Sequence, residues 1–422
     1  MSVNYYFAII LIYLTACRLT AEENGTCTFT LQKGTAKNPL ILKHKPKIEF
    51  FYPDPYNEDK EDERKLKSDK FNEYRLSKGE KIRVTCLDKK FEKVPHHQLV
   101  VQCVDDQLVQ RRNIFMNFND MECDDFPAAT IKNIYEECHE NSSIIETGYT
   151  ISKVFLKVMS VCFDKNEQKV VYSWYRRSMA HRGETLDVTW PEYKYGTEYK
   201  FNVTEVYTVE YQQNLLTKIL KSKSLAKKYV KDEKTNFLNK THITWEGDYV
   251  HGAEQAITFR YINVAPVWKT IEEGSWTELK KFVRNTIITS KENSAQYRIF
   301  SGTHGVATLP DTKKVEQKLY MYTDTEKENY LPVPLYIWKI IYNKKSGKGM
   351  VLISINNPYL KKVSKDYIIC KDSHPDCKNT LKQINNHTNI KKGYVFCCDV
   401  EDFCKITNNN YLLKQLIEND KA

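Results

Sequence analysis

The sequence predicts a mixed α+β protein in two parts, and three observations lead to this prediction. Short apolar runs between cysteines fill the first third of the chain, longer strand-like runs begin near residue 148, and two amphipathic helical patterns interrupt them. With 422 residues, 41% of them hydrophobic and 28% charged, the composition is globular, which excludes a fibrous or a disordered protein. The length allows one large core or two modest ones.

The N-terminus carries the one apolar run that approaches the length of a membrane span. It extends from Phe7 to Ala16, about ten residues, which suits the apolar part of a signal peptide. Small residues suited to cleavage follow at Thr15-Ala16-Cys17 or Leu19-Thr20-Ala21. The alternative is an apolar N-terminal strand. We expect residues 1–21 to be a signal peptide, the mature protein to be secreted and extracellular, and no helix to span a membrane.

The cysteines also indicate export. Removal of Cys17 with the signal leaves eleven, at Cys27, Cys86, Cys103, Cys123, Cys138, Cys162, Cys370, Cys377, Cys397, Cys398 and Cys404. Their spacing does not match a zinc site, so we expect disulfides formed in an oxidising compartment, with the odd thiol either free or paired between chains. Glycosylation sequons at Asn24, Asn141, Asn202, Asn239 and Asn386 agree with an exported glycoprotein.

Residues 22–147 form the first expected region, which is β-rich and tied by disulfides. Short apolar runs at Lys47–Tyr52 and His97–Val104 are typical of strands, and the segment Asn57–Lys70 is densely charged. Residues 148–422 form the second region. Its expected strands are Ile151–Cys162, Gln168–Tyr175, Tyr297–Ser301, Tyr336–Tyr342 and Met350–Ile355, and a small disulfide-bonded tail from Cys370 to Cys404 follows.

Part of the net charge of +10 is concentrated in one lysine-rich segment. From Lys218 to Lys234 the chain reads KILKSKSLAKKYVKDEK, with seven lysines against two acidic residues. Its apolar residues are spaced as on one face of a helix, so we expect an amphipathic helix with a cationic face. Such a face either binds phosphate or is merely solvated, and a lysine excess also arises from compositional drift.

A strand and a helix are expected in the centre of the second region. Residues Gln255–Ala265 alternate apolar and polar side chains, which predicts a strand that Pro266 ends. Ser275 and Glu278 have the spacing of a capping box at the start of a helix. The helix then carries one apolar stripe, formed by Leu279, Phe282, Val283, Thr286 and Ile287.

These central residues resemble a known family. The fragments NFLNKTH (236–242), TFRYINVAPVWKTIEEGSW (258–276) and TELKKFVRN (277–285) resemble the core of the DNA/RNA non-specific endonucleases, which have the ββα-metal fold. The resemblance covers roughly residues 150–360. Within the family, the chain is most similar to the secreted salivary branch of tsetse-type insects. The resemblance therefore implies a ββα-metal nuclease-like core.

In active members of that family an Asp-Arg-Gly-His motif supplies the base, an Asn before a Gly-x-Trp helix holds Mg²⁺, and a Glu in that helix orders the metal's water. Here His242 stands at the base position, while Lys240 replaces the arginine and Asn239 and Thr241 flank it. The metal-holding Asn corresponds to Glu272 and the helix Glu to Lys280. Asn263, in YINVAP, matches the family's Asn.

The resemblance implies altered chemistry at these positions. Lys240 keeps the charge of arginine but loses its planar fork. Glu272 is an acceptable oxygen ligand for Mg²⁺, whereas Lys280 places an ammonium where a carboxylate supports the metal, so we expect Mg²⁺ binding to be weak or lost. The candidate catalytic residues are His242, Lys240 and Asn263, and the candidate metal ligand is Glu272. Nucleic-acid contacts are expected from Lys240, Lys280, Lys227, Lys228, Lys231, Arg260 and Lys269.

Three functions remain open from the sequence. The first is sequence-independent binding of DNA and RNA through the phosphate backbone, with weak or no hydrolysis. The second is an active Mg²⁺-dependent endonuclease that cleaves both DNA and RNA. The third is a secreted interaction protein that kept only the scaffold. The sequon Asn239-Lys240-Thr241 ends one residue before His242, and a glycan on Asn239 would favour the functions without catalysis.

Overall fold

The computed structural model describes residues 26–30, 39–44, 48–50, 73–104, 107–110, 114–116, 121–176, 198–249, 251–289, 297–371 and 375–417. The expected signal peptide and the charged segment Asn57–Lys70 lie outside these residues. The chain forms two compact units, and the second begins at Phe126 rather than at the expected residue 148. The boundary falls earlier because the two strands that follow Phe126 belong to the sheet of the second unit.

The first unit is β-rich, as predicted, and two disulfides tie it. Strands β1 (Thr26–Thr30) and β3 (Glu73–Ser77) form an antiparallel pair. A five-stranded sheet has the order β2-β4-β5-β6-β7, with bounds Leu40–Lys43, Lys81–Thr85, Gln98–Val104, Gln107–Gln110 and Ile114–Met116. The disulfides Cys27–Cys103 and Cys86–Cys123 lie in its buried core. Together they stabilise a unit with a small apolar interior.

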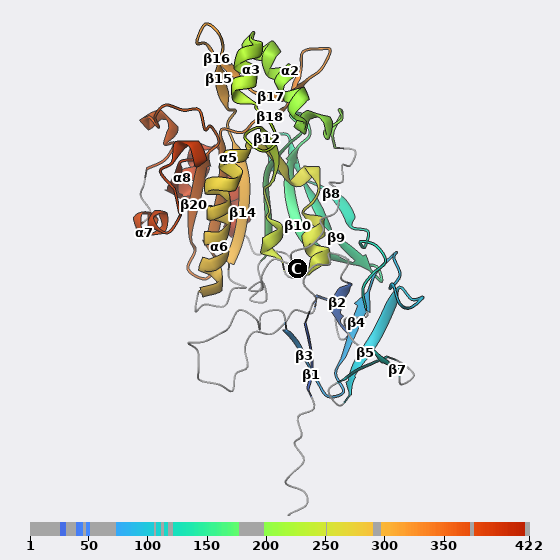
Figure 1. Ribbon diagram of the computed structural model, residues 1–422. Coiled ribbons are helices and arrows are strands. Elements are labelled where there is room, and N and C mark those ends of the chain that lie inside the picture. Colours follow the sequence, from blue (N-terminus) through green and yellow to red (C-terminus); the bar gives the residue numbers. More distant parts are fainter. Residues whose placement is uncertain are drawn as a thin grey trace, which may run out of the picture. The chain divides into compact units, whose positions relative to one another are not determined.

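An eight-stranded antiparallel sheet forms the framework of the second unit (Figure 1). Its order is β21-β20-β19-β14-β11-β10-β9-β8. In chain order the strands are β8 (Thr130–His139), β9 (Ser142–Ile151), β10 (Val154–Asp164), β11 (Lys169–Arg176), β14 (Tyr297–His304), β19 (Tyr336–Asn343), β20 (Lys348–Ile355) and β21 (Val395–Asp399). The expected segment Ile151–Cys162 is a turn and a strand, because positive φ angles at Ser152 and Lys153 reverse the chain there.

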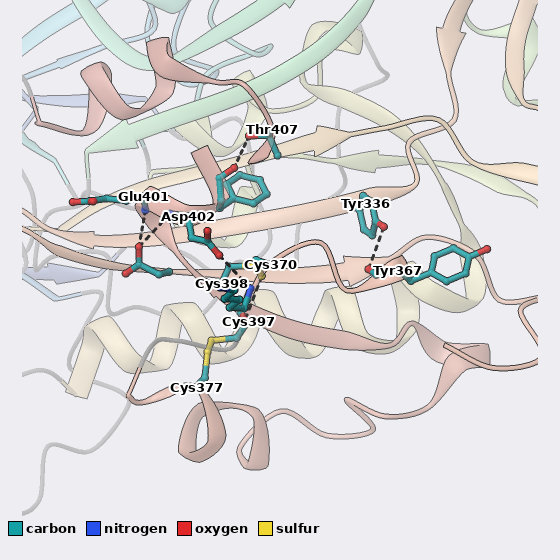
Figure 2. The surroundings of a disulfide bond; sticks show 12 residues. Tyr336, Tyr367, Cys370, Cys377, Cys397, Cys398, Glu401, Asp402 and Thr407 are labelled. Atoms are coloured by element: carbon teal, nitrogen blue, oxygen red, sulfur yellow. Dashed lines mark hydrogen bonds between the residues drawn. A yellow bond between two sulfur atoms is a disulfide. The ribbon is translucent and has the colours of Figure 1, made fainter. Parts of the chain in front are cut away.

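The C-terminal tail is disulfide-bonded, as predicted, but it is not separate from the sheet. Its strand β21 pairs with β20. Cys370–Cys398 and Cys377–Cys397 fix it, as Figure 2 shows. Helices α7 (Cys377–Lys382), α8 (Val400–Ile406) and α9 (Asn410–Ile417) belong to the tail, with the 3-10 turns η8 (Lys365–Tyr367) and η9 (Ile390–Lys392).

A third disulfide of this unit, Cys138–Cys162, joins β8 to β10 and crosses the boundary expected at 148. Among the described residues the cysteine outside a disulfide is Cys404, which is buried within its own chain. Burial raises the pKa of its thiol to about 12. A thiol held in its protonated form is a weak nucleophile, so Cys404 is a packing residue.

The central segment contains a two-stranded ribbon and several helices. In chain order these are η3 (Glu205–Tyr207), α2 (Val209–Leu220), α3 (Lys223–Tyr229), β12 (Leu238–His242), η4 (Glu246–Asp248), α4 (Gly252–Ile257), η5 (Tyr261–Asn263), β13 (Val264–Trp268), α5 (Lys269–Ile271), the π-turn η6 (Glu272–Trp276) and α6 (Thr277–Thr289). Two further ribbons are β15 (Thr308–Pro310) with β16 (Glu316–Lys318), and β17 (Tyr320–Thr323) with β18 (Asn329–Pro332). No helix in the described part of the chain is both long and apolar enough to cross a membrane.

Three local predictions in this segment need correction. The lysine segment is two helices, because Lys221 takes a left-handed conformation that ends α2 and Ser222 caps α3. The expected strand Gln255–Ala265 is wrong, because α4 and η5 occupy most of it. Nearly every residue of the segment is buried, so the alternation of apolar and polar side chains does not distinguish a strand from helical turns. Pro266 lies inside β13, where its carbonyl accepts a hydrogen bond from Asn356 Nδ2 at 3.2 Å.

The capping box is also wrong, although the helix after it is confirmed. The helical turns that begin at Lys269 break at Gly274, whose φ of −92° and ψ of −117° are not helical, so Ser275 lies at the start of the next helix. Its Oγ lies 2.8 Å from Ser354 Oγ on β20, so the hydroxyl contacts the sheet instead of capping α6. Gly274 is required at this point, since a Cβ there would come within 2.5 Å of the Lys392 carbonyl oxygen. The apolar stripe of α6 packs inward as predicted, with Leu279 and Val283 fully buried.

Candidate functional site

Strand β12 carries the expected base and the lysine beside it. His242 and Lys240 are two residues apart on an extended strand, so their side chains lie on the same face, while Asn239 and Thr241 lie on the other. The strand pairs with β13, and Lys240 is opposite Pro266. Helix α2 fixes the start of β12, because the Gln212 amide exchanges two hydrogen bonds, of 2.8 and 2.9 Å, with the backbone of Leu238.

The His242 ring is fixed by contacts on two sides. Its side chain is 7% exposed, and its Nδ1 lies 2.6 Å from Glu246 Oε2. The ring meets Phe259 edge to face, with centroids 4.5 Å apart. Because a carboxylate only accepts hydrogen bonds, Nδ1 carries the proton and Nε2 is the acceptor of the neutral ring. This is the tautomer that a general base requires.

Glu246 is a member of the site that the sequence interpretation missed. Its second oxygen, Oε1, accepts a hydrogen bond of 3.0 Å from Trp245 Nε1. Burial acts to raise the pKa of the Glu246 carboxyl, but the charge and hydrogen bond of His242, with the charge of Lys280, outweigh it and lower the pKa to about 2. Glu246 is therefore ionised, and one carboxylate holds both the histidine and the indole.

Two cations of α6 lie over the Trp245 indole. Lys280 Nζ is 5.3 Å from the ring centre and Arg284 Cζ is 5.8 Å from it. Such cation–aromatic contacts hold a charge in a fixed position at a partly buried site. Gly247 lets the indole lie flat on the turn, since a Cβ there would come within 2.6 Å of the ring. Lys280 is itself only 7% exposed, so it is part of the wall of the site rather than a loose surface charge.

The charge of Glu246 leads to a stability prediction. A carboxyl with a pKa of about 2 in the folded state and the ordinary 4.5 when unfolded stabilises the fold above pH 4.5, by about 3 kcal/mol, and loses that contribution as the pH falls toward 2. Glu246→Gln should therefore lower the free energy of unfolding at pH 6 and much less at pH 3. Urea unfolding at both pH values measures this. Glu273→Gln, at an exposed carboxylate of the same region, is the control, and an equal loss at both pH values for Glu246→Gln would contradict the prediction.

Glu272, the candidate metal ligand, contacts the other face of β12. Its Oε2 accepts a hydrogen bond of 2.6 Å from Asn239 Nδ2, and Asn239 Oδ1 accepts one of 3.0 Å from the Lys240 amide. Among the described residues, no three His, Cys, Asp or Glu side chains are grouped so that they could hold a metal ion. The donor set for Mg²⁺ is thus one carboxylate already bonded to an amide, which does not fit a protein-held Mg²⁺ site. A glycan on Asn239 would also disturb this contact.

The Asn263 side chain joins two backbone segments by hydrogen bonds. It is fully buried, and its Nδ2 donates to the carbonyl oxygens of Thr244 at 2.9 Å and Thr258 at 3.0 Å. Its Oδ1 accepts from the Thr244 amide at 2.9 Å. These bonds hold the chain directly after His242, so Asn263 positions the base and does not face a substrate.

The remaining candidate contacts divide into two groups. Lys227, Lys228 and Lys231 are exposed on α3 and just beyond it. Arg260 and Lys269 are half-buried: Arg260 lies near Glu198, and burial lowers its pKa, while Lys269 Nζ donates to the Glu233 carbonyl at 2.7 Å. The first group is accessible to a phosphate backbone, whereas Arg260 is partly covered by the protein and Lys269 is already hydrogen-bonded within it.

A buried ion pair anchors the turn that carries Glu246. Asp248, two residues after Glu246, has its Oδ2 3.0 Å from Lys339 Nζ on β19, and neither side chain is exposed. Lys339 also lies 5.9 Å from the centre of the Tyr175 ring on β11. The turn η4 is therefore held to the middle of the large sheet.

The fold and this site together define a class of protein. The sequence model of the DNA/RNA non-specific endonucleases matches residues 141–403, which contain seven of the eight strands of the sheet, the β12–β13 ribbon and α6. The chain belongs to this family, and the expected α+β nuclease-like fold is confirmed.

Individual relatives place it more narrowly. The chain is 25% identical over 292 residues to the salivary endonuclease of Lutzomyia longipalpis, with 67% of each chain covered. It is 22% identical to the salivary protein Tsal1 of Glossina morsitans morsitans over 70% of this chain and 72% of the relative. It is 23% identical to Tsal2A of the same fly over 67% and 69%. The predicted similarity to the insect salivary branch is confirmed.

Three side chains of the site were missed from the sequence, namely Trp245, Glu246 and Arg284. A local signal was available for Arg284, which is four residues after Lys280 on α6, a separation that brings side chains together on a helix. Glu246 is also four residues after His242, but His242 ends β12 and Glu246 begins η4, so helical spacing does not predict their contact. No local signal links Trp245 to α6, because the two segments meet only in the folded chain.

Proposed function

We propose that this protein binds DNA and RNA through their phosphate backbone, without sequence preference, and hydrolyses them weakly or not at all. The observation that carries the proposal is the position of Lys280. Its ammonium occupies the position where the family resemblance implies a metal-supporting carboxylate. It lies over the Trp245 ring and close enough to Glu246 for its charge to lower the pKa of that carboxyl. Lys240 and Arg284 add charge on neighbouring elements.

The lysines of α3 would extend this surface. Gln213 Nε2 of α2 donates to the carbonyls of Val230 and Lys231, at 3.0 and 3.1 Å, and its neighbour Gln212 is bonded to β12. The cationic end of α3 is therefore joined through α2 to the strand that carries Lys240. Backbone binding by such a set of lysines is electrostatic and falls steeply with salt.

Binding of this kind needs no divalent ion, because the cations are side chains. Mg²⁺ is the cofactor that the family implies, and Glu272 is the residue that would bind it here. We propose that any such binding is weak, since Lys280 repels a cation and Asn239 already occupies the Glu272 carboxylate. Secretion into an oxidising, extracellular medium would suit the five disulfides and the salivary relatives.

Mg²⁺-dependent hydrolysis of DNA and RNA is the second candidate function. One observation favours it: the contact between His242 and Glu246 leaves Nε2 as an acceptor, the orientation that a base needs to take a proton from water. In this candidate Glu272 holds the ion and His242 activates the nucleophile.

A paired measurement on one preparation tests the proposal. Affinity for a duplex DNA and for an RNA of the same sequence is measured by fluorescence anisotropy, with Mg²⁺ and with EDTA, while DNA cleavage is followed on gels. For each nucleic acid we expect the dissociation constant in Mg²⁺ and the one in EDTA to agree within about threefold. We also expect little turnover of DNA. Cleavage at ordinary nuclease rates, about 1–10³ s⁻¹, that EDTA abolishes would favour the second candidate. The absence of both binding and cleavage would leave a scaffold-only interaction protein.

A further inference from the structure

The site contains an oriented base and fixed cations, and this combination suits one nucleophile in particular. We propose that the protein cleaves RNA without a divalent ion, by activating the substrate's own 2′-hydroxyl. The proposal rests on the proposed binding of RNA at this site. It goes beyond that function because it adds an internal transesterification of RNA, a reaction distinct from the hydrolysis by water that the proposed function holds to be weak or absent.

The base is His242. Its Nδ1 is held 2.6 Å from the Glu246 carboxylate, and Phe259 packs against the ring edge to face. Glu246 is in turn held by the Trp245 indole at 3.0 Å. A histidine whose partner and ring position are both fixed presents Nε2 in a single direction, as the histidine of a nucleophile–base–carboxylate arrangement does. Glu246 is a positioning residue in this reaction, since it acts only through His242.

Two cations accompany the base, one on its own strand and one beside the carboxylate that contacts it. Lys240 shares the face of β12 with His242 and lies 6.0 Å from the centre of the buried Tyr261 ring. Lys280 lies beside Glu246, over the indole that Glu246 holds. Charge that develops on the phosphate oxygens would meet these ammonium groups in a partly buried place, where electrostatic stabilisation is stronger than in water.

The 2′-hydroxyl is the nucleophile that such a site can use. Hydrolysis by water requires a site that binds and activates a free molecule, and the Mg²⁺ donors here are a single carboxylate bonded to Asn239. The 2′-hydroxyl of RNA is already attached beside the phosphorus, and attached nucleophiles in good geometry have effective concentrations of ~10⁵ M or more. A base and a cation then suffice. DNA lacks this hydroxyl and should remain intact.

The reaction balances within the substrate and the named side chains. His242 Nε2 takes the 2′-hydroxyl proton, the 2′-oxygen forms a bond to phosphorus, and the bond from phosphorus to the 5′-oxygen breaks. The departing 5′-oxygen takes a proton from the Lys240 ammonium. The products are a 2′,3′-cyclic phosphate and a 5′-hydroxyl, and proton exchange through solvent returns His242 and Lys240 to their starting forms.

The experiment uses the full mature chain in EDTA with three oligonucleotides of one sequence: RNA, 2′-O-methyl RNA and DNA. We expect cleavage of the RNA alone, with a 2′,3′-cyclic phosphate detected by mass spectrometry. His242→Ala should reduce the rate by at least ~10²-fold. Glu246→Gln should reduce it by ~10-fold or more and change its pH profile, a result that a purely structural carboxylate would not give.

Matched controls separate this reaction from contamination and from loss of binding. His96→Ala, at an exposed histidine of the first unit, is purified identically and should keep the full rate. RNA affinity is measured for each variant beside its rate, so that a loss of binding is not taken for a loss of catalysis. Intact RNA in EDTA, despite wild-type binding, would overturn this inference and leave the proposed function standing. Equal rates for wild type and His242→Ala would overturn it too. If the wild-type protein does not bind RNA, both this inference and the proposed function fail.

Discussion

Replacing Lys339 with methionine should destabilise the second unit by ~3–5 kcal/mol, the largest effect that we expect from a single substitution. Lys339 and Asp248 are both 0% exposed, and their charged atoms are 3.0 Å apart. Removing one partner leaves the other charge buried in a medium that solvates it poorly. Thermal or urea unfolding of the variant should show this loss, with a fall in Tm of roughly 5–10 °C.

A double variant distinguishes this cause from a simple cavity. Lys339→Met with Asp248→Leu removes both charges, so much of the lost stability should return, because apolar pairs of similar volume often replace buried ion pairs at no cost. Lys344→Met, in the exposed turn after β19, is the control for lysine loss. A loss below about 1 kcal/mol for Lys339→Met, or no recovery in the double variant, would show that the pair does not hold the turn.

Removing the exposed lysines of α3 should have the largest effect on binding. The triple variant Lys227→Ala, Lys228→Ala, Lys231→Ala should lower affinity for duplex DNA on the order of 10²-fold at 0.1 M salt. It should also reduce the slope of log K against log salt by about 3, because each lost phosphate contact contributes about 0.9. Titrations at four or more salt concentrations measure both quantities.

The matched control for this variant is a second lysine cluster. Lys344 and Lys345 are exposed in the turn between β19 and β20, and Lys348 is exposed at the start of β20. The triple alanine variant at these positions removes the same charge. It should change affinity by a few-fold at most, through net charge alone. Equal effects of the two triple variants would mean that α3 is not a specific part of the interface.

Local patterns were sufficient for much of the fold. Cysteine spacing and short apolar runs indicated a disulfide-tied β-rich first part, and the structure has two disulfides and two sheets there. The apolar stripe of α6 was correct because its spacing is set within a few turns. The strand expected at Gln255–Ala265 was wrong, because a segment in which nearly every residue is buried loses the contrast between polar and apolar faces on which period analysis depends.

The candidate site divides in the same way. The sequence by itself determined the family, and it predicted the candidate base at His242 and the replacement of two family positions by Lys240 and Lys280, since motif spacing is carried along the chain. It also located the cationic segment that became α3.

Only the tertiary structure decided what these residues touch. Glu246 meets His242 and Trp245, Lys280 and Arg284 lie over that indole, and Asp248 pairs with a lysine 91 residues away. Contact energies depend on distance in space, and a buried charge is tolerated only where the folded chain brings a partner to it. For that reason the lysine at position 280 could be read from the sequence, whereas the carboxylate and the indole that hold it could not.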